Sequence, residues 1–338
     1  MRTARIKAEG TGYYHIMSKA IEGRFIFGRA ERRMFREIMR KLETFCGLRI
    51  LTYSILSTHW HILLEVPASR PVSDRELVRR IRVLYGSMTA REISDRLREL
   101  RDCGQDTAAE QFKAGYTYRM YDLSEFCKSL KQRFSQYYNK KHSRCGTLWS
   151  QRFKSVLVEG SQNALLTMAA YIDLNAVRAG LVSDPREYRW CGYGEAMGGS
   201  RVARAGLAYL MGCIGRNGRW SDVGRHYRKW LYVQGRQKGL GPDGKPLRGG
   251  FSAEQVKAVL EAEGRLSRHQ ILRCRVRYLS DGLVLGGAEF VDGVFRRYRD
   301  QFGLKRRTGP RAMKYGKWDG LTTMRDLRKA VILIPSAG

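Results

Sequence analysis

The order of β-prone and helical segments constrains the fold of this chain more than any other feature of its sequence. Apolar patterning marks β-prone runs at 13–18, 48–56 and 60–66, and a further alternating strand ends at Glu159. Apolar residues at helical spacing mark helices at 30–46, 124–141 and 162–180. Gly47 and Gly180 lie where glycine is typical of a helix C-terminus. The order of elements is therefore β-α-β-β-α-β-α.

This order predicts an α+β fold of the ferredoxin-like, split βαβ type, in which helices pack against an antiparallel sheet. Residues 68–122 interrupt the order as an insertion that is rich in Arg, Ser and Glu and mostly helical in pattern. We expect a first domain at 1–198, a helical extension and linker at 199–250, and a basic, mostly helical, DNA-binding domain at 251–338. The turn-rich segment 239–250 marks the last boundary.

The charge of the chain indicates its partner. It carries 63 Lys and Arg against 32 Asp and Glu, a formal net charge of +31. Such an excess favours a polyanion, with nucleic acid ahead of an anionic membrane surface. Because there is no run of ~18 apolar residues and no signal-peptide core, we expect neither membrane insertion nor secretion. The seven cysteines form no Cys-x-x-Cys pair, which indicates reduced thiols in a cytoplasmic protein.

Two histidines on a predicted strand are the first candidates for chemistry. His59 and His61 lie two residues apart, so both imidazoles face the same side of the sheet and can hold one metal ion jointly. A His-x-His pair is equally compatible with two inert side chains on an exposed strand, and that interpretation stays open. His15 lies on the first strand, where we expect a structural role.

Tyr171 and Asn175 are the second candidates. They lie four residues apart on a predicted helix, so a phenol and a carboxamide project from one face. An amide oxygen is a suitable ligand for Mg²⁺ or Mn²⁺, and a phenol can act as a nucleophile. The alternatives are packing at the rim of the core for Tyr171 and a helix cap for Asn175.

Together these residues resemble a known family. The segment His59-Trp60-His61 is similar to the His-hydrophobic-His motif of the HUH single-strand endonucleases. Residues 148–155 (LWSQRFKS) and 171–182 (YIDLNAVRAGLV) are similar to the IS200-like transposases and, within them, to the REP-associated tyrosine transposases. The resemblance covers roughly residues 8–195, and a less specific one to a C-terminal extension covers 265–330.

The resemblance implies roles for four residues. Tyr171 is implied as the nucleophile, and His59, His61 and Asn175 as the ligands of Mg²⁺ or Mn²⁺. The implied reaction cleaves single-stranded or hairpin-bearing DNA, leaves a 5′-phosphotyrosine and a free 3′-OH, and rejoins strands without ATP. The implied setting is the cytoplasm of a bacterium, in association with the nucleoid.

The chain departs from the family pattern at two positions. Thr58 stands where the family usually has Asn before the first histidine, and Thr can still form a hydrogen bond. Ala176 stands where the family usually has Pro, which predicts a more continuous helix after Tyr171.

Basic residues interleaved with aromatics are expected to contact the DNA strand, although a solvated helix face would give the same pattern. The residues are Lys131, Arg133, Tyr137, Arg152, Lys154 and Arg178.

Two other functions stay open. The first is a domesticated nucleic-acid-binding regulator without catalysis, and the second is a replication initiator or relaxase that shares the chemistry. The sequence does not distinguish a monomer from a dimer.

Overall fold

Strands and helices alternate in the order that the sequence predicts. The computed structural model describes residues 5–212, 219–232, 272, 275–314, 316–325 and 332–333. The first elements are, in order, β1 (Gly12–Lys19), the 3-10 helix η1 (Ile21–Gly23), α1 (Arg29–Cys46), β2 (Arg49–Ile55), β3 (His59–Val66), α5 (Leu123–Lys141), β4 (Lys154–Val158) and α6 (Gln162–Asp173). The insertion between β3 and α5 contains α2 (Asp74–Tyr85), α3 (Ser87–Asp102) and α4 (Asp106–Thr117).

The rest of the described chain consists of shorter elements. They are α7 (Asn175–Arg178), η2 (Pro185–Glu187), α8 (Gly192–Met197), α9 (Arg201–Gly212), α10 (Trp220–Tyr232), β5 (Arg275–Val276), α13 (Arg277–Asp281), β6 (Val284–Gly286), α14 (Ala288–Arg297), η3 (Arg299–Gln301), β7 (Arg311–Ala312), β8 (Thr322–Thr323) and β9 (Ile332–Leu333). The expected helices at 199–250 are therefore found as α9 and α10. No described helix is both long and apolar enough to cross a membrane.

The main sheet has seven strands in the order β2-β3-β1-β4-β6-β8-β7. Strand β1 pairs antiparallel with both β3 and β4, and β2 pairs antiparallel with β3. The register places Met17 opposite His61 and Lys19 opposite His59. Because directly opposite residues share a face, both histidines lie on the same side of the sheet as these two β1 residues.

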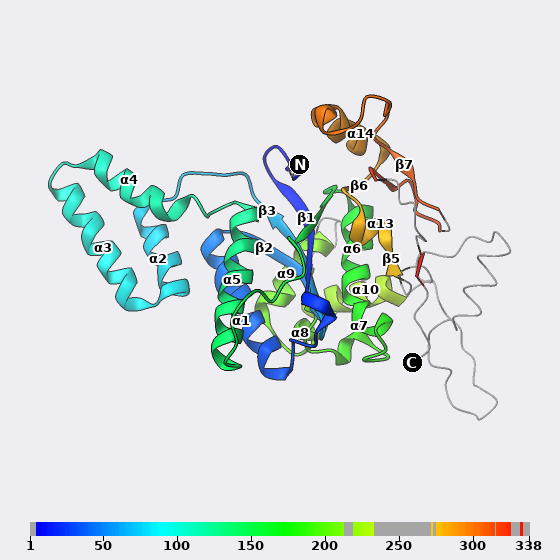
Figure 1. Ribbon diagram of the computed structural model, residues 1–338, viewed down its shortest axis with the longest axis horizontal. Coiled ribbons are helices and arrows are strands. Elements are labelled where there is room, and N and C mark those ends of the chain that lie inside the picture. The colour runs from blue at the N-terminus through cyan, green and yellow to red at the C-terminus, as the bar shows by residue number, and fades with distance from the viewer. Residues whose placement is uncertain are drawn as a thin grey trace.

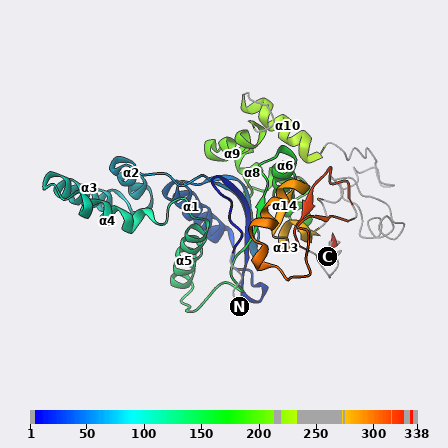
Figure 2. The same cartoon turned by 90° about the horizontal axis from the view of Figure 1, so that it is seen from above.

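Helices cover both faces of the sheet, which confirms the α+β class. Figure 2 shows α1 and α5 on one side and α6, α8, α13 and α14 on the other. The side chains alternate accordingly along β3: Trp60 and Ile62 face the α1 and α5 layer, and His61 faces the α6 layer. The candidate site therefore lies between the sheet and α6.

An aromatic cluster fixes α1 and α5 on their side of the sheet. Phe134 of α5 is fully buried and lies 5.0 Å from the ring of Phe27 and 5.2 Å from that of Phe35. Trp149, in the loop before β4, lies 5.9 Å from Phe134 and donates its indole N–H to Ser135. This loop leads directly into β4, whose first residue, Lys154, stands opposite Met17 beside the candidate site.

The insertion forms a helical arm that projects away from the sheet (Figure 1). Leu77, Ile81 and Leu97 are buried between its helices, so the arm has a small core of its own. Arg80, which is 4% exposed, joins the arm to the body by donating to the carbonyl of Phe45 at the end of α1. The insertion expected at 68–122 is thus helical.

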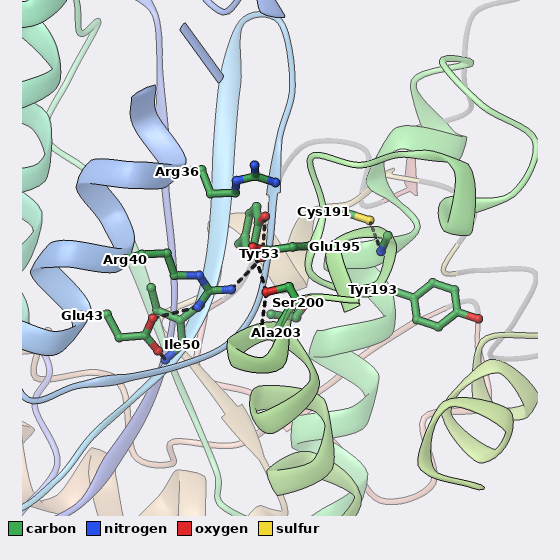
Figure 3. Close-up of polar contacts among 12 residues, drawn as sticks. Arg36, Arg40, Glu43, Ile50, Tyr53, Cys191, Tyr193, Glu195, Ser200 and Ala203 are labelled. Atoms are coloured by element: carbon green, nitrogen blue, oxygen red, sulfur yellow. Dashed lines mark hydrogen bonds and ion pairs between the residues drawn. The ribbon is translucent and has the colours of Figure 1, made fainter. Parts of the chain in front are cut away.

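A buried polar network closes the outer edge of the sheet at β2. Figure 3 shows Arg40 of α1 between Glu43, at 2.7 Å, and Glu195 of α8, at 2.8 Å. The hydroxyl of Tyr53 donates to the same Glu195 carboxylate. The α9 helix packs so closely on β2 that a Cβ on Gly206 would overlap backbone oxygens of the strand. The edge of β2 is therefore covered and not open to pairing.

The described part of the C-terminal segment adds strands to the main sheet. Within the described residues, β6 pairs parallel with β4, and β8 and β7 continue the same sheet. The described part of 251–338 therefore combines helices α13 and α14 with strands that extend the sheet, because β4 presents a free edge that the Val284–Gly286 strand satisfies. The turn-rich segment 239–250 and residues 251–271 of the expected helical domain lie outside the described residues.

Candidate functional site

Three histidines meet on one face of the sheet. The rings of His59 and His61 on β3 are 5.2 Å apart, and the ring of His15 on β1 stacks on His61 at 5.0 Å. His15 and His61 are diagonal neighbours across the two strands, a position from which long side chains can touch. His15 is 1% exposed and His61 3%, whereas His59 is half-buried and bonds Thr58 through Nδ1 at 2.9 Å. Thr58 thus makes the hydrogen bond expected of it.

Hydrogen bonds determine which nitrogen of His61 carries its proton. His15 Nδ1 lies 2.8 Å from the carbonyl oxygen of Leu279, which can only accept, so this nitrogen is protonated. Burial lowers the pKa of His15 to about 4 and that of His61 well below its usual range, so both rings are neutral at pH 7. His15 Nε2 must then accept from His61 Nδ1, at 2.8 Å. This chain from His61 through His15 to Leu279, here called the histidine relay, leaves the lone pair of His61 Nε2 available to a cation.

Tyr171 of α6 lies against this histidine cluster. Its ring centre is 6.2 Å from that of His15 and 6.2 Å from that of His61, edge-on to both. The guanidinium of Arg178 lies 4.0 Å from the centre of the Tyr171 ring, a cation–π contact. Tyr171 is 2% exposed. A phosphodiester can reach the phenol only after some of these covering groups move.

The helix that carries Tyr171 stops sooner than the sequence predicts. It ends at Asp173, and the four-residue α7 begins at Asn175 after Leu174. At this break, the side chain of Arg178 donates a hydrogen bond to the backbone carbonyl oxygen of Tyr171 at 2.5 Å. The continuity expected after Tyr171 is therefore interrupted at Leu174, before Ala176, where this guanidinium satisfies the Tyr171 carbonyl that a continuous helix would pair internally.

Asp173 anchors the end of α6 to the sheet and to two later helices. It accepts from the hydroxyl of Thr52 at 2.8 Å, from that of Tyr227 at 2.6 Å and from the backbone N–H of Tyr193 at 3.2 Å. Burial raises its pKa to about 6, against the lowering effect of these donors. Three elements therefore hold the turn that follows Tyr171.

Of the three implied metal ligands, the structure brings His59 and His61 side by side, and it places Asn175 buried at the start of α7, just after the turn that follows Tyr171. Among the described residues, no three His, Cys, Asp or Glu side chains gather to hold a metal. Asn175 adds an amide, whose Nδ2 is buried without a hydrogen-bond partner in the described structure. The unprotonated Nε2 of His61 suits a Mg²⁺ or Mn²⁺ site. Nδ2 of Asn175 is a hydrogen-bond donor and does not ligate a cation, so the Asn175 ligand would be the amide oxygen.

The expected DNA contacts lie in two places. Arg133 and Tyr137 are on α5, on the far face of the sheet, where Arg133 lies 4.9 Å from the ring centre of Tyr85. Lys131, also on α5, donates to the carbonyl of Gln151 at 2.9 Å.

The other three lie nearer to the histidines. Arg152 is exposed, and Lys154 of β4 pairs with Asp281 at 2.5 Å. The guanidinium of Arg178 donates hydrogen bonds to the backbone carbonyls of Tyr171 and Leu272. Their roles in DNA binding stay predictions.

The sequence does not predict that His15 and Lys19 lie beside this site. His15 is predicted to be structural, and no motif marks Lys19. Their alternation with Met17 on β1 is visible in the sequence, but the register that brings them beside His61 and His59 is not.

Comparisons with known proteins add little to this geometry. No protein-family model and no curated protein matches the sequence. Among solved structures, the chain is similar to a REP-associated tyrosine transposase bound to a REP hairpin, with 13% sequence identity and a TM-score of 0.39. The match covers 60% of this chain and 90% of that chain. The proposals below therefore rest on the residues of this chain.

Proposed function

We propose that the chain is a metal-dependent tyrosine transposase, an HUH-type endonuclease that cleaves and rejoins single-stranded, hairpin-bearing DNA through Tyr171. The observation that carries this proposal is the meeting of Tyr171 with His61 and His15, from elements far apart in the sequence. The strand order β2-β3-β1-β4 with its antiparallel pairing is that of a split βαβ fold, which supports the expected ferredoxin-like arrangement. The net charge of +31 supports a nucleic-acid substrate.

The residues divide the chemistry among them. His59, His61 and Asn175 would hold Mg²⁺ or Mn²⁺, which when bound supplies charge stabilisation at the scissile phosphate. Tyr171 loses its phenolic proton to solvent, and its oxygen bonds to phosphorus. The bond from phosphorus to the 3′ oxygen breaks, and that oxygen takes up a proton from solvent to give a free 3′-OH. The phosphotyrosine ester conserves the bond energy, so attack by another 3′-OH reverses the step and joins strands.

The burial of Tyr171 sets a condition on this reaction. Arg178 covers one face of the ring and is itself held by the carbonyl of Leu272, in the C-terminal segment. The same segment supplies the carbonyl of Leu279 to His15. Substrate entry therefore requires Arg178 and its partner to shift while the histidine relay stays in place.

A covalent adduct tests the proposal. The wild-type chain is incubated with Mn²⁺ and labelled single strands that carry hairpins, and products are separated under denaturing conditions. We expect a labelled protein band that Tyr171→Phe abolishes and that His61→Ala strongly reduces. Absence of any adduct from the wild type across a library of hairpin-flanked strands would contradict the proposal.

A regulator without catalysis is the second candidate, and the 2% exposure of Tyr171 favours it. In that case Tyr171→Phe and His59→Ala bind hairpin DNA as the wild type does, and no adduct forms. A replication initiator or relaxase would form the same adduct. Strand joining between two hairpin ends, measured by the length of the product, distinguishes the transposase from it.

A further inference from the structure

We propose that a basic pocket next to the histidine cluster binds the phosphate and base of one unpaired nucleotide in the substrate strand. The pocket, here called the Arg152 pocket, is lined by Arg5, Arg152, Lys154, Asp281, Phe302 and Arg325. It lies where the chain before β1, the start of β4 and the C-terminal segment meet. The proposal rests on the proposed function and deepens it, because it assigns a subsite for the same strand.

The size of the Arg152 pocket suits one nucleotide. Its volume is about 280 Å³. This is just below the range of about 300–1,000 Å³ for small-molecule sites, and too small for a duplex. Leu283 and Phe302 give it an apolar wall, so it offers a surface for a base as well as donors for a phosphate.

The positive charge of the Arg152 pocket is only partly neutralised from within the protein, because its one lining carboxylate, Asp281, pairs with Lys154. In the part of the chain that the structure describes, Arg5, Arg152 and Arg325 have no carboxylate partner; Arg5 donates to the carbonyl of Phe153 and Arg325 to that of Asp281. The carboxylate of Asp281 is occupied by Lys154, at 2.5 Å, and by Arg277, at 2.9 Å.

Two of the arginines of the pocket, Arg5 and Arg152, are close enough to repel each other. Burial and the nearby charge of Arg152 lower the pKa of Arg5. The Arg5 guanidinium is held in place 3.6 Å from the centre of the Phe153 ring. Converging guanidinium groups of one sign are a typical arrangement for binding a phosphate through several charge-assisted hydrogen bonds.

A second cavity lies between the Arg152 pocket and the histidines. Its volume is about 120 Å³, and it shares Arg152 and Lys154 with the pocket. Its other wall includes Met17 and Lys19, which stand opposite His61 and His59 in the sheet. A row of cations thus leads from the candidate metal ligands to the pocket. A single strand whose backbone follows this row would place a neighbouring nucleotide in the pocket.

Binding of a short fluorescent oligothymidylate tests the proposal. All proteins carry Tyr171→Phe, so that no covalent step interferes, and affinity is measured by anisotropy over a range of salt concentrations. The pocket variants are Arg152→Gln and the double variant Arg5→Gln with Arg325→Gln. Arg91→Gln, which removes one positive charge from an exposed position on α3, is the control.

We expect each pocket variant to bind about tenfold more weakly than its parent. The slope of log affinity against log salt should fall by about 0.7 for each phosphate that the variant no longer binds. Arg91→Gln should bind as the parent does. Thermal unfolding of every variant, compared with its parent, shows whether weaker binding comes from misfolding.

Two results would overturn the pocket assignment. The first is equal affinity of the folded pocket variants and Arg91→Gln. The second is a slope of log affinity against log salt that is unchanged in the folded pocket variants.

The adduct assay separates this proposal from the proposed function. If the pocket assignment fails while the wild type still forms the Tyr171 adduct, the proposed function stands alone. If no adduct forms while the folded pocket variants bind weakly, only the pocket assignment survives.

Discussion

Replacing His15 with Phe tests how the site prepares His61 for a cation. The Phe ring keeps the stacking on His61 but removes the acceptor for His61 Nδ1–H and the donor to the Leu279 carbonyl. Without that acceptor, the proton of His61 is no longer held on Nδ1 and can occupy Nε2. Loss of a hydrogen-bond partner of a metal-ligating histidine typically lowers metal affinity by ~10–100-fold, or about 1.4–2.7 kcal/mol.

The measurement is Mn²⁺ binding by electron paramagnetic resonance, carried out on the Tyr171→Phe chain. We expect His15→Phe to weaken Mn²⁺ affinity by ~10–100-fold. His15→Gln, which returns an acceptor near the former Nε2, should recover most of it. The Leu279 carbonyl loses its partner in His15→Phe, so a stability loss of about 1–3 kcal/mol is also expected. Unchanged Mn²⁺ affinity in a folded His15→Phe chain would refute the relay.

Three further predictions concern stability. The pKa of about 6 for Asp173 lies above its unfolded value of 3.8, so the folded state holds the proton more tightly and stability falls as pH rises from 4 to 7. In the wild type, the free energy of unfolding in urea should fall by about 3 kcal/mol over this pH range, and in Asp173→Asn it should not. The same pH dependence in both proteins would contradict this prediction. Arg178→Ala should cost about 2 kcal/mol, because two backbone carbonyls and the Tyr171 ring lose their partner, and an unchanged melting temperature would count against those contacts. Phe134→Ala should cost ~3–5 kcal/mol by leaving a cavity in the aromatic cluster, and a loss below about 1 kcal/mol would show that the cluster collapses around it.

Most of the fold could be predicted because it depends on local patterns. The apolar spacing of Met39, Leu42 and Phe45 and the left-handed Gly47 that ends α1 are properties of one segment. The sheet extension by β6 could not be predicted in this way. Its three residues are a weak β signal, and their pairing depends on the free edge of a strand much earlier in the chain.

The site likewise has features that local patterns predict and features that depend on contacts between distant segments. His59 and His61 share a face by strand geometry alone, so their meeting could be predicted from spacing. The part played by His15 depends on the register between β1 and β3, and its tautomer on a carbonyl of the C-terminal segment. The pairing of Lys154 with Asp281 likewise joins residues whose proximity no local pattern encodes.

The most direct test of the account is to locate the DNA on the chain by mass spectrometry. After reaction with Mn²⁺ and a hairpin-bearing single strand, nuclease and trypsin digestion should leave a short nucleotide on the peptide 155–178. Tyr171 is the one tyrosine in that peptide. The account predicts a 5′-phosphonucleotide on Tyr171. A modified peptide from elsewhere in the chain, or no modified peptide at all, would contradict it.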